Sequence, residues 1–180
     1  MLKSSVEVSG LISQQLFEVG KIVDLFKTNE YEAVEKWMQW LKISEDLLKK
    51  YNYNEASLLA GLRANILKEE KTVEVRKKRK QIVSQALASI DSGQNVLFSI
   101  NKNLSDKIDT VRTLIKQILI PAKEAGLISS ENIADFGQYL ESLLRQFKQH
   151  PQLASSINNA IGLIGKFDVL RIIAEEIEFC

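Results

Sequence analysis

The stretch LFSINKNLSDKIDTVRTLIKQI, residues 97–118, decides the fold. Its apolar side chains recur at steps of three and four along the chain, at Leu97, Ile100, Leu104, Ile108, Val111, Ile115 and Ile118. Side chains with this spacing share one face of an α-helix, which is the pattern of a helix with one apolar stripe. The stretch therefore predicts one long helix near residues 95–120.

Similar stripes on both sides of this stretch predict further helices. We expect them at about residues 4–27 and 30–50, across 55–90 as one helix or two, from Ser129 and Ser130 to His150, and at about 151–164 and 168–179. Asn29 is suited to cap the second of these helices, because its side chain can accept a hydrogen bond from a free backbone N–H. Gly93 suits the left-handed residue that follows a helix, so a helix end is expected at 91–93. Pro121 is expected to kink or end the long helix.

The composition agrees with a helical protein. The chain has 180 residues, of which 45% are hydrophobic, and it contains only 8 glycines and 2 prolines. The low number of glycines and prolines argues against a β-sandwich or barrel. The hydrophobic content is enough for the core of one domain or of two small lobes. We predict an all-α fold, an irregular bundle of six to eight helices. It forms a single domain over 1–180, or two lobes at 1–67 and 81–180 joined by a charged helical elbow at 68–80.

The net charge and the low numbers of histidine and cysteine argue against some classes of function. The net charge is +1, which does not favour a protein that binds polyanions over its whole surface. One histidine and one cysteine, Cys180, are too few for a His/Cys zinc cluster, so we expect no metal and no cofactor. No apolar stretch approaches the roughly 20 residues of a membrane span, and no secretory signal is visible, so the expected location is the cytoplasm. On the helix at 30–50, acidic residues precede lysines by four positions, which favours surface ion pairs at Glu32–Lys36, Glu45–Lys49 and Asp46–Lys50.

A run of five cations is the strongest local anomaly of charge. It consists of Arg76, Lys77, Lys78, Arg79 and Lys80. Five consecutive positions point around most of a helix, so neighbouring acidic residues cannot pair with all of them. The run suits contact with phosphates or with an acidic partner. Alternatively it is a solvated helix that protrudes from the core.

Arg145 and His150 are separated by four residues in RQFKQH, residues 145–150. This spacing resembles the R-x4-H signature of the HEPN-domain ribonucleases, which are small helical bundles. The resemblance implies that Arg145 stabilises a phosphate and that His150 acts as general acid or base. Gln146 stands where that family usually has Asn, Asp or His, and Pro151 follows His150 directly. A histidine that stabilises the end of a helix is the alternative interpretation.

Two tryptophans, Trp37 and Trp40, lie within one broad face of the predicted second helix together with Tyr31. Exposed, they would provide apolar contacts for a partner, since aromatic side chains dominate binding hot spots. Buried, they would be core residues whose indole N–H groups find partners locally.

These observations favour a non-catalytic helical module for protein–protein interaction, an adaptor that could self-associate through the stripe at 97–118. The partner is then another protein or a second copy. The alternative is a nucleic-acid-binding protein that uses residues 76–80, with a HEPN-like ribonuclease as its extreme form. No membrane span is expected in either case.

Overall fold

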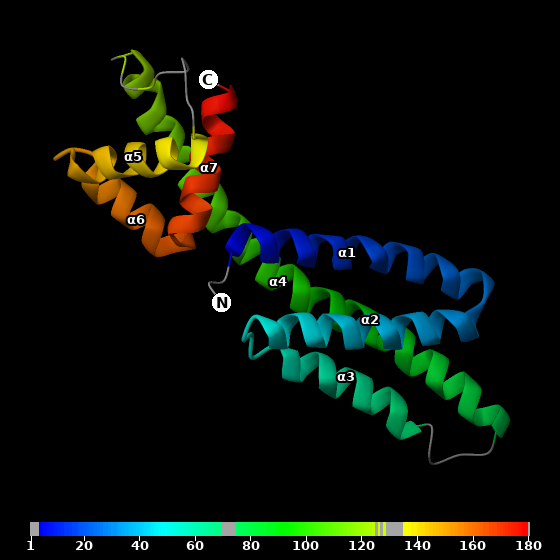
Figure 1. Ribbon diagram of the computed structural model, residues 1–180. Helices are drawn as coiled ribbons and strands as arrows, with labels where there is room; N and C mark the ends of the chain where they lie inside the picture. Colours follow the sequence, from blue (N-terminus) through cyan, green and yellow to red (C-terminus); the bar gives the residue numbers. More distant parts are fainter. Residues whose placement is uncertain (1–3, 70–74, 125, 127, 129–134, 180) are drawn as a thin grey trace. The chain divides into compact units, whose positions relative to one another are not determined.

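The computed structural model describes residues 4–69, 75–124, 126, 128 and 135–179, with the backbone alone at 69, 75–79, 178 and 179. Within these residues the chain forms seven helices and no strands (Figure 1). They are α1 (Ser5–Thr28), α2 (Glu30–Lys50), α3 (Ala56–Glu69), α4 (Val75–Glu124), α5 (Phe136–Gln149), α6 (Ala154–Ile164) and α7 (Lys166–Phe179). The predicted all-α class and the long helix near 95–120 are therefore confirmed. The region 55–90 contains two helices, α3 and the first part of α4.

The expected cap of α2 is confirmed, and two further helix ends have clear local causes. The side chain of Asn29 accepts a hydrogen bond from the backbone N–H of Glu32, at 3.3 Å, and so caps α2. Gly165 has a φ of +89° between α6 and α7, a left-handed conformation that glycine adopts without steric cost. The cap of α5 is Asp135, which accepts from the N–H of Gln138. The expected start at Ser129 and Ser130 lies outside the described residues.

The expected helix end at 91–93 is wrong, because α4 continues through Gly93 to Glu124. Gly93 is buried, and a Cβ atom added there would lie 2.9 Å from two ring carbons of Trp37. Because glycine has no side chain, α2 can approach α4 closely at Gly93. Gly93 therefore does not mark a turn. Pro121 also lies inside α4 and does not end it.

The chain divides into two units. Unit 1 comprises Met1–Glu7 and Asn103–Cys180, and unit 2 comprises Val8–Lys102. Both α1 and α4 contribute to each unit. The predicted lobes at 1–67 and 81–180 stay a prediction, because much of the elbow between them, including 70–74, is outside the described residues.

Unit 2 is a bundle of α1, α2, α3 and the first part of α4 (Figure 1). Its largest fully buried side chains are Trp37, Ile12, Leu41, Leu48, Leu59 and Leu97. The rings of Trp37 and Trp40 stack with their centroids 4.6 Å apart. Polar bridges join α1 to α4, where Ser9 donates to Asn101 and Asn101 donates to Ser13. The core of unit 2 is thus built around two aromatic rings.

Unit 1 has an aliphatic core in which the last part of α4 packs with α5, α6 and α7 (Figure 1). Val111, Ile115, Ile118 and Leu119 contribute from α4, and Phe147 is its only buried aromatic residue among those described. The stripe that decided the fold is therefore an internal surface. Six of its seven members are buried, and Ile108 is partly buried.

The buried carboxylate of Asp168, in the first turn of α7, fixes the start of α1 in unit 1. It accepts hydrogen bonds from the hydroxyl of Ser4 at 2.6 Å and from the backbone N–H groups of Ser5 and Val6. Ser4 in turn accepts from the N–H of Glu7. Because the first N–H groups of a helix have no partner within it, Asp168 acts as a cap supplied from a distant helix.

Candidate interaction groove

Trp37 and Gly93 fix the position of α2 against α4 in unit 2. The indole N–H of Trp37 donates to the hydroxyl of Ser89 at 2.8 Å, and that hydroxyl donates to the carbonyl of Ala86 at 2.7 Å. The indole N–H and the hydroxyl are both satisfied at this buried contact, which favours one register of α2 against α4. The same register brings the starts of the two helices to opposite sides of a groove.

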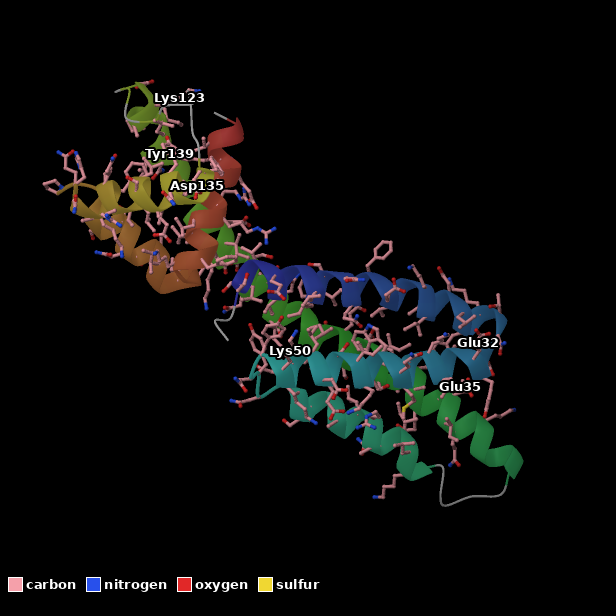
Figure 2. All side chains as sticks on the ribbon, viewed as in Figure 1. Glu32, Glu35, Lys50, Lys123, Asp135 and Tyr139 are labelled. Carbon is pink, nitrogen blue, oxygen red and sulfur yellow. The ribbon has the colours of Figure 1, made fainter. Side chains whose placement is uncertain are left out.

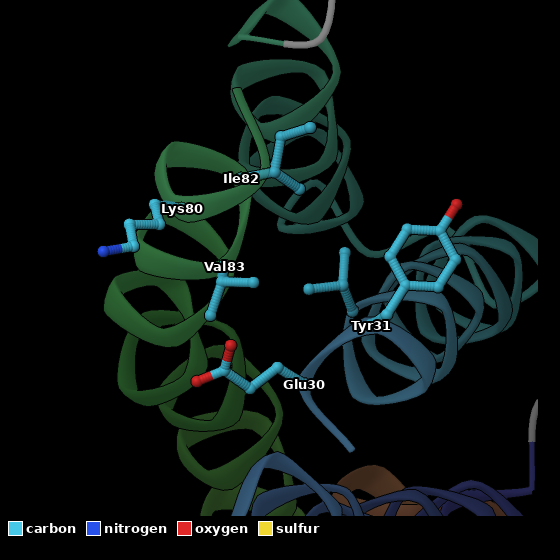
Figure 3. A pocket seen from close by; sticks show the side chains of 6 residues that line it. Glu30, Tyr31, Lys80, Ile82 and Val83 are labelled. Carbon is cyan, nitrogen blue, oxygen red and sulfur yellow. The ribbon is translucent and has the colours of Figure 1, made fainter. Parts of the chain in front are cut away.

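This groove has a volume of about 210 Å³ (Figure 3). Its α2 wall consists of Glu30, Tyr31 and Val34, and its α4 wall consists of Lys80, Ile82 and Val83. Figure 3 shows Val83 and Ile82 on α4 and the ring of Tyr31 on α2. The helices α2 and α4 are therefore in close contact at Gly93. Nearer their starts they are separated by a space that is lined mainly by apolar side chains.

The apolar residues of the groove are only partly covered by the chain itself. Val34 is buried, whereas Ile82 and Val83 are half-buried and Tyr31 is 62% exposed. An occupant would remove this remaining apolar surface from water, which stabilises a complex by about 25 cal/mol for each Å². A tyrosine at such an edge adds a large contact area with a polar tip.

One charge stands on each wall of the groove. Glu30 comes from α2 and Lys80 from α4, and neither forms an ion pair with any side chain that the structure describes. Glu30 is in the first turn of α2, where a carboxylate interacts favourably with the helix dipole. The first turn of α4 has no acidic residue. The two walls therefore differ in the sign of their charge.

The basic run begins α4. Arg76, Lys77, Lys78 and Arg79 follow its first residue, and their side chains lie outside the described residues. Lys80 is exposed and lines the groove. The run thus places its positive charge at a helix start that is already positive, directly before Ile82 and Val83.

Trp37 and Trp40, considered above as contacts for a partner, are core residues instead. They are 0% and 3% exposed. The indole N–H of Trp40 donates to the carbonyl of Gln15 at 2.8 Å, and that of Trp37 to Ser89. Neither ring offers surface for an apolar contact with another protein.

Arg145 and His150 lie in different surroundings in unit 1. Arg145 lines a broad depression of about 530 Å³ in unit 1, together with Asp135, Gly137, Gln138, Glu141 and Ser142. His150 is exposed, does not line this depression, and follows the last residue of α5, where its backbone N–H donates to the carbonyl of Gln146. The joint action of Arg145 and His150 on one phosphate therefore stays a prediction.

Two buried ion clusters were missed in the sequence. In unit 1, Arg112 donates to Glu175 at 2.8 Å and to Glu176 at 2.6 Å, and Lys116 lies 3.4 Å from Glu176. In unit 2, Lys49 and Arg63 both pair with Glu45, which is 2% exposed. The spacing of Glu45 and Lys49 predicted their pairing, but as a surface pair. Burial and Arg63 could not be inferred from that spacing.

These clusters change the pKa values of their members. For Glu45, the hydrogen bond from Lys49 and the contact with Arg63 outweigh burial, and the pKa lies below its usual value. For Glu175, burial on its own raises the pKa, but hydrogen bonds from Arg112 and Arg171 outweigh it, so the pKa is lowered. The hydrogen bond to Glu175 is the main reason why the pKa of Arg112 is raised. These carboxylates are ionised and engaged in holding helices together.

The described residues contain no group of three or more His, Cys, Asp or Glu side chains that could hold a metal ion. In the same part of the chain, no helix combines the length and apolar character needed to cross a membrane. Comparisons of the chain with protein-family models, with curated proteins and with solved structures find no match.

Proposed function

We propose that this protein is a non-catalytic helical module that binds a segment of a protein in the groove between α2 and α4. The observation that carries the proposal is the combination of a partly uncovered apolar lining, Tyr31, Ile82 and Val83, with a charge on each wall. An amphipathic helix that lies in an apolar groove is a recurrent mode of peptide recognition. The lining supplies apolar anchors and the charged walls set orientation.

Selection of peptides against the groove tests this proposal. A phage-displayed library of random peptides is selected on the parent protein and counter-selected on Val83→Asp, which places a charge in the lining. Phe98→Asp is the control, because Phe98 is an exposed apolar residue of the same helix, α4, and does not line the groove. We expect peptides that bind the parent and Phe98→Asp equally and bind Val83→Asp at least tenfold more weakly. Peptides that tolerate Val83→Asp, or no enrichment at all, contradict the proposal. Circular dichroism checks that each variant retains its helices.

A second candidate function is nucleic-acid binding, which the position of the basic run favours. Residues 76–80 lie at the positive end of α4, and its first turn has no acidic residue to neutralise them. Binding to phosphates would fall steeply with salt because each neutralised phosphate releases counterions. Replacing Lys77, Lys78 and Arg79 with Gln would then flatten the salt dependence by about 3 units, one for each lost contact. Absence of binding to duplex DNA or single-stranded RNA by the parent at low salt rejects this candidate.

A further inference from the structure

We infer that the occupant of the groove is the same groove of a second copy of this chain, so that the protein self-associates through α2 and α4. This inference rests on the proposed function and specifies the partner. Self-association was expected from the sequence through the stripe at 97–118, but that stripe is buried within the chain. The surface must therefore be sought among apolar residues that the chain does not cover completely. Exposed Tyr31 and half-buried Ile82 and Val83 are such residues, and they line one groove.

The arrangement of charge identifies the occupant. Glu30 marks the α2 wall as acidic, and Lys80 marks the α4 wall as basic. In a contact with two-fold symmetry the same patch is used by both copies, so residue i of one copy meets residue j of the other, and j meets i. The acidic wall of one copy then faces the basic wall of the other, and the Glu30–Lys80 contact forms twice. The groove is thus complementary to itself.

A segment with charges of a single sign matches only one wall. A uniformly acidic segment would be attracted by Lys80 and repelled by Glu30, and a uniformly basic segment would show the reverse. Two further acidic residues, Glu32 and Glu35, lie near the start of α2 (Figure 2). A second copy satisfies both walls at the same time.

The expected association is weak and depends on salt. Stable protein interfaces bury about 800 Å² on each partner, and the six residues of this groove make up only the centre of such an area. Charges at the edge of an interface are screened within about 10 Å at 0.1 M salt. We therefore expect a monomer–dimer equilibrium in the micromolar to millimolar range that shifts toward monomer as the salt concentration rises.

Charge reversal tests the pairing directly by sedimentation equilibrium on the full chain. Glu30→Lys and Lys80→Glu should each weaken self-association at least tenfold, because like charges then face each other twice. An equimolar mixture of the two variants should restore it, since each contact in the mixed dimer again joins opposite charges. The double variant with both changes should self-associate like the parent. Lys102→Glu, an exposed change on α4 outside the groove, is the matched control and should leave the association unchanged.

Specific outcomes overturn the inference. One is a parent that stays monomeric up to about 1 mM, the weak end of the expected range of dissociation constants. Another is a dimer that tolerates both single changes, or a mixture that stays monomeric while the double variant also fails to associate. A monomeric parent from which groove-directed peptides are still selected refutes self-association and leaves the proposed function standing. Failure of both experiments refutes both.

Discussion

The two units each bury a glutamate and pair it with two cations, but they recruit those cations differently. In unit 2, Glu45 on α2 pairs with Lys49, four residues later, and with Arg63, 18 residues later on α3. In unit 1, Glu176 on α7 pairs with Arg112 and Lys116, and the hydrogen bond from Arg112 spans 64 residues. Arg112 also holds Glu175. Unit 2 thus neutralises its carboxylate with one local and one more distant cation, and unit 1 with cations that are both distant.

This difference shows that similar ion pairs can have unequal consequences. If Arg63 is removed, Glu45 keeps Lys49 on its own helix. If Arg112 is removed, two carboxylates lose their shared partner and only Lys116, at 3.4 Å, remains near Glu176. A buried charge left without a partner is far more costly than the net contribution of the intact pair. The cluster of unit 1 should therefore be the more sensitive of the two.

Arg112→Met should produce the largest effect. We expect the free energy of unfolding to fall by about 3 kcal/mol, because buried Glu176 loses its closest cation. Urea denaturation followed by circular dichroism measures the change. Arg171→Met is the control, since Arg171 is half exposed and, among the side chains that the structure describes, pairs with Glu175 alone. It should cost less than about 1 kcal/mol.

Tryptophan fluorescence sharpens this first comparison. The chain has 2 tryptophans, Trp37 and Trp40, and both lie in unit 2. Their fluorescence therefore reports on unit 2, whereas circular dichroism reports on all helices. With Arg112→Met, the fluorescence transition should shift less than the dichroism transition. Equal shifts would show that the two units unfold together. The different ion clusters would then not give the two units different stabilities.

Gly93→Ala tests the aromatic packing of unit 2. The new methyl group would lie 2.9 Å from the Trp37 ring and 3.4 Å from Leu41, so α2 and α4 must separate slightly. We expect a loss of about 2 kcal/mol, detected by tryptophan fluorescence in urea. Gly61→Ala is the matched control, because Gly61 lies in α3 with no atom within 4 Å of the new methyl. It should stabilise the protein by up to about 1 kcal/mol, since alanine favours a helix more than glycine does. A harmless Gly93→Ala would contradict the close approach described here.

Arg63→Met should have a smaller effect, about 1 kcal/mol, because Glu45 retains Lys49. The same fluorescence measurement applies, with the exposed ion pair Lys42–Asp46 as control. Lys42→Met should change the free energy of unfolding by less than about 0.5 kcal/mol. If Arg63→Met costs as much as Arg112→Met, the local lysine does not protect Glu45 and the proposed difference between the clusters is wrong.

Acidic pH should lower the stability of both units, by less than the substitutions above. Glu45 and Glu175 have pKa values below the ordinary 4.5 in the folded protein. Their contribution to stability is complete above pH 4.5 and is lost as the pH falls through the lowered folded values, because protonation then favours the unfolded chain. Thermal unfolding midpoints measured from pH 7 to pH 3 should fall mainly below pH 4.5. In Arg112→Met this fall should be shallower, and an unchanged pH dependence would argue against the role of Arg112 in lowering the pKa of Glu175.

The sequence predicted what depends on local periodicity and capping. The stripe from Leu97 to Ile118 and the Asn29 cap both follow from rules that act within one or two helical turns. Gly93 was misjudged because glycine serves two purposes, a left-handed turn or a close approach, and only the position of Trp37, 56 residues earlier, distinguishes them. The groove and the buried state of Glu45 were beyond prediction for the same reason. Both depend on contacts between different helices, and no local sequence pattern predicts those contacts.

The hydrogen bond between Ser4 and Asp168 has a consequence for the order in which the protein can fold during synthesis. Residues 8–102 form one continuous unit, so all of its contacts become available once Lys102 has left the ribosome. Ser4 must wait for a partner 164 residues later. Domains generally fold as they are made, from the N-terminal end. The beginning of α1 therefore leaves the ribosome before unit 2, but it acquires its contacts with Asp168 only after that unit is able to fold.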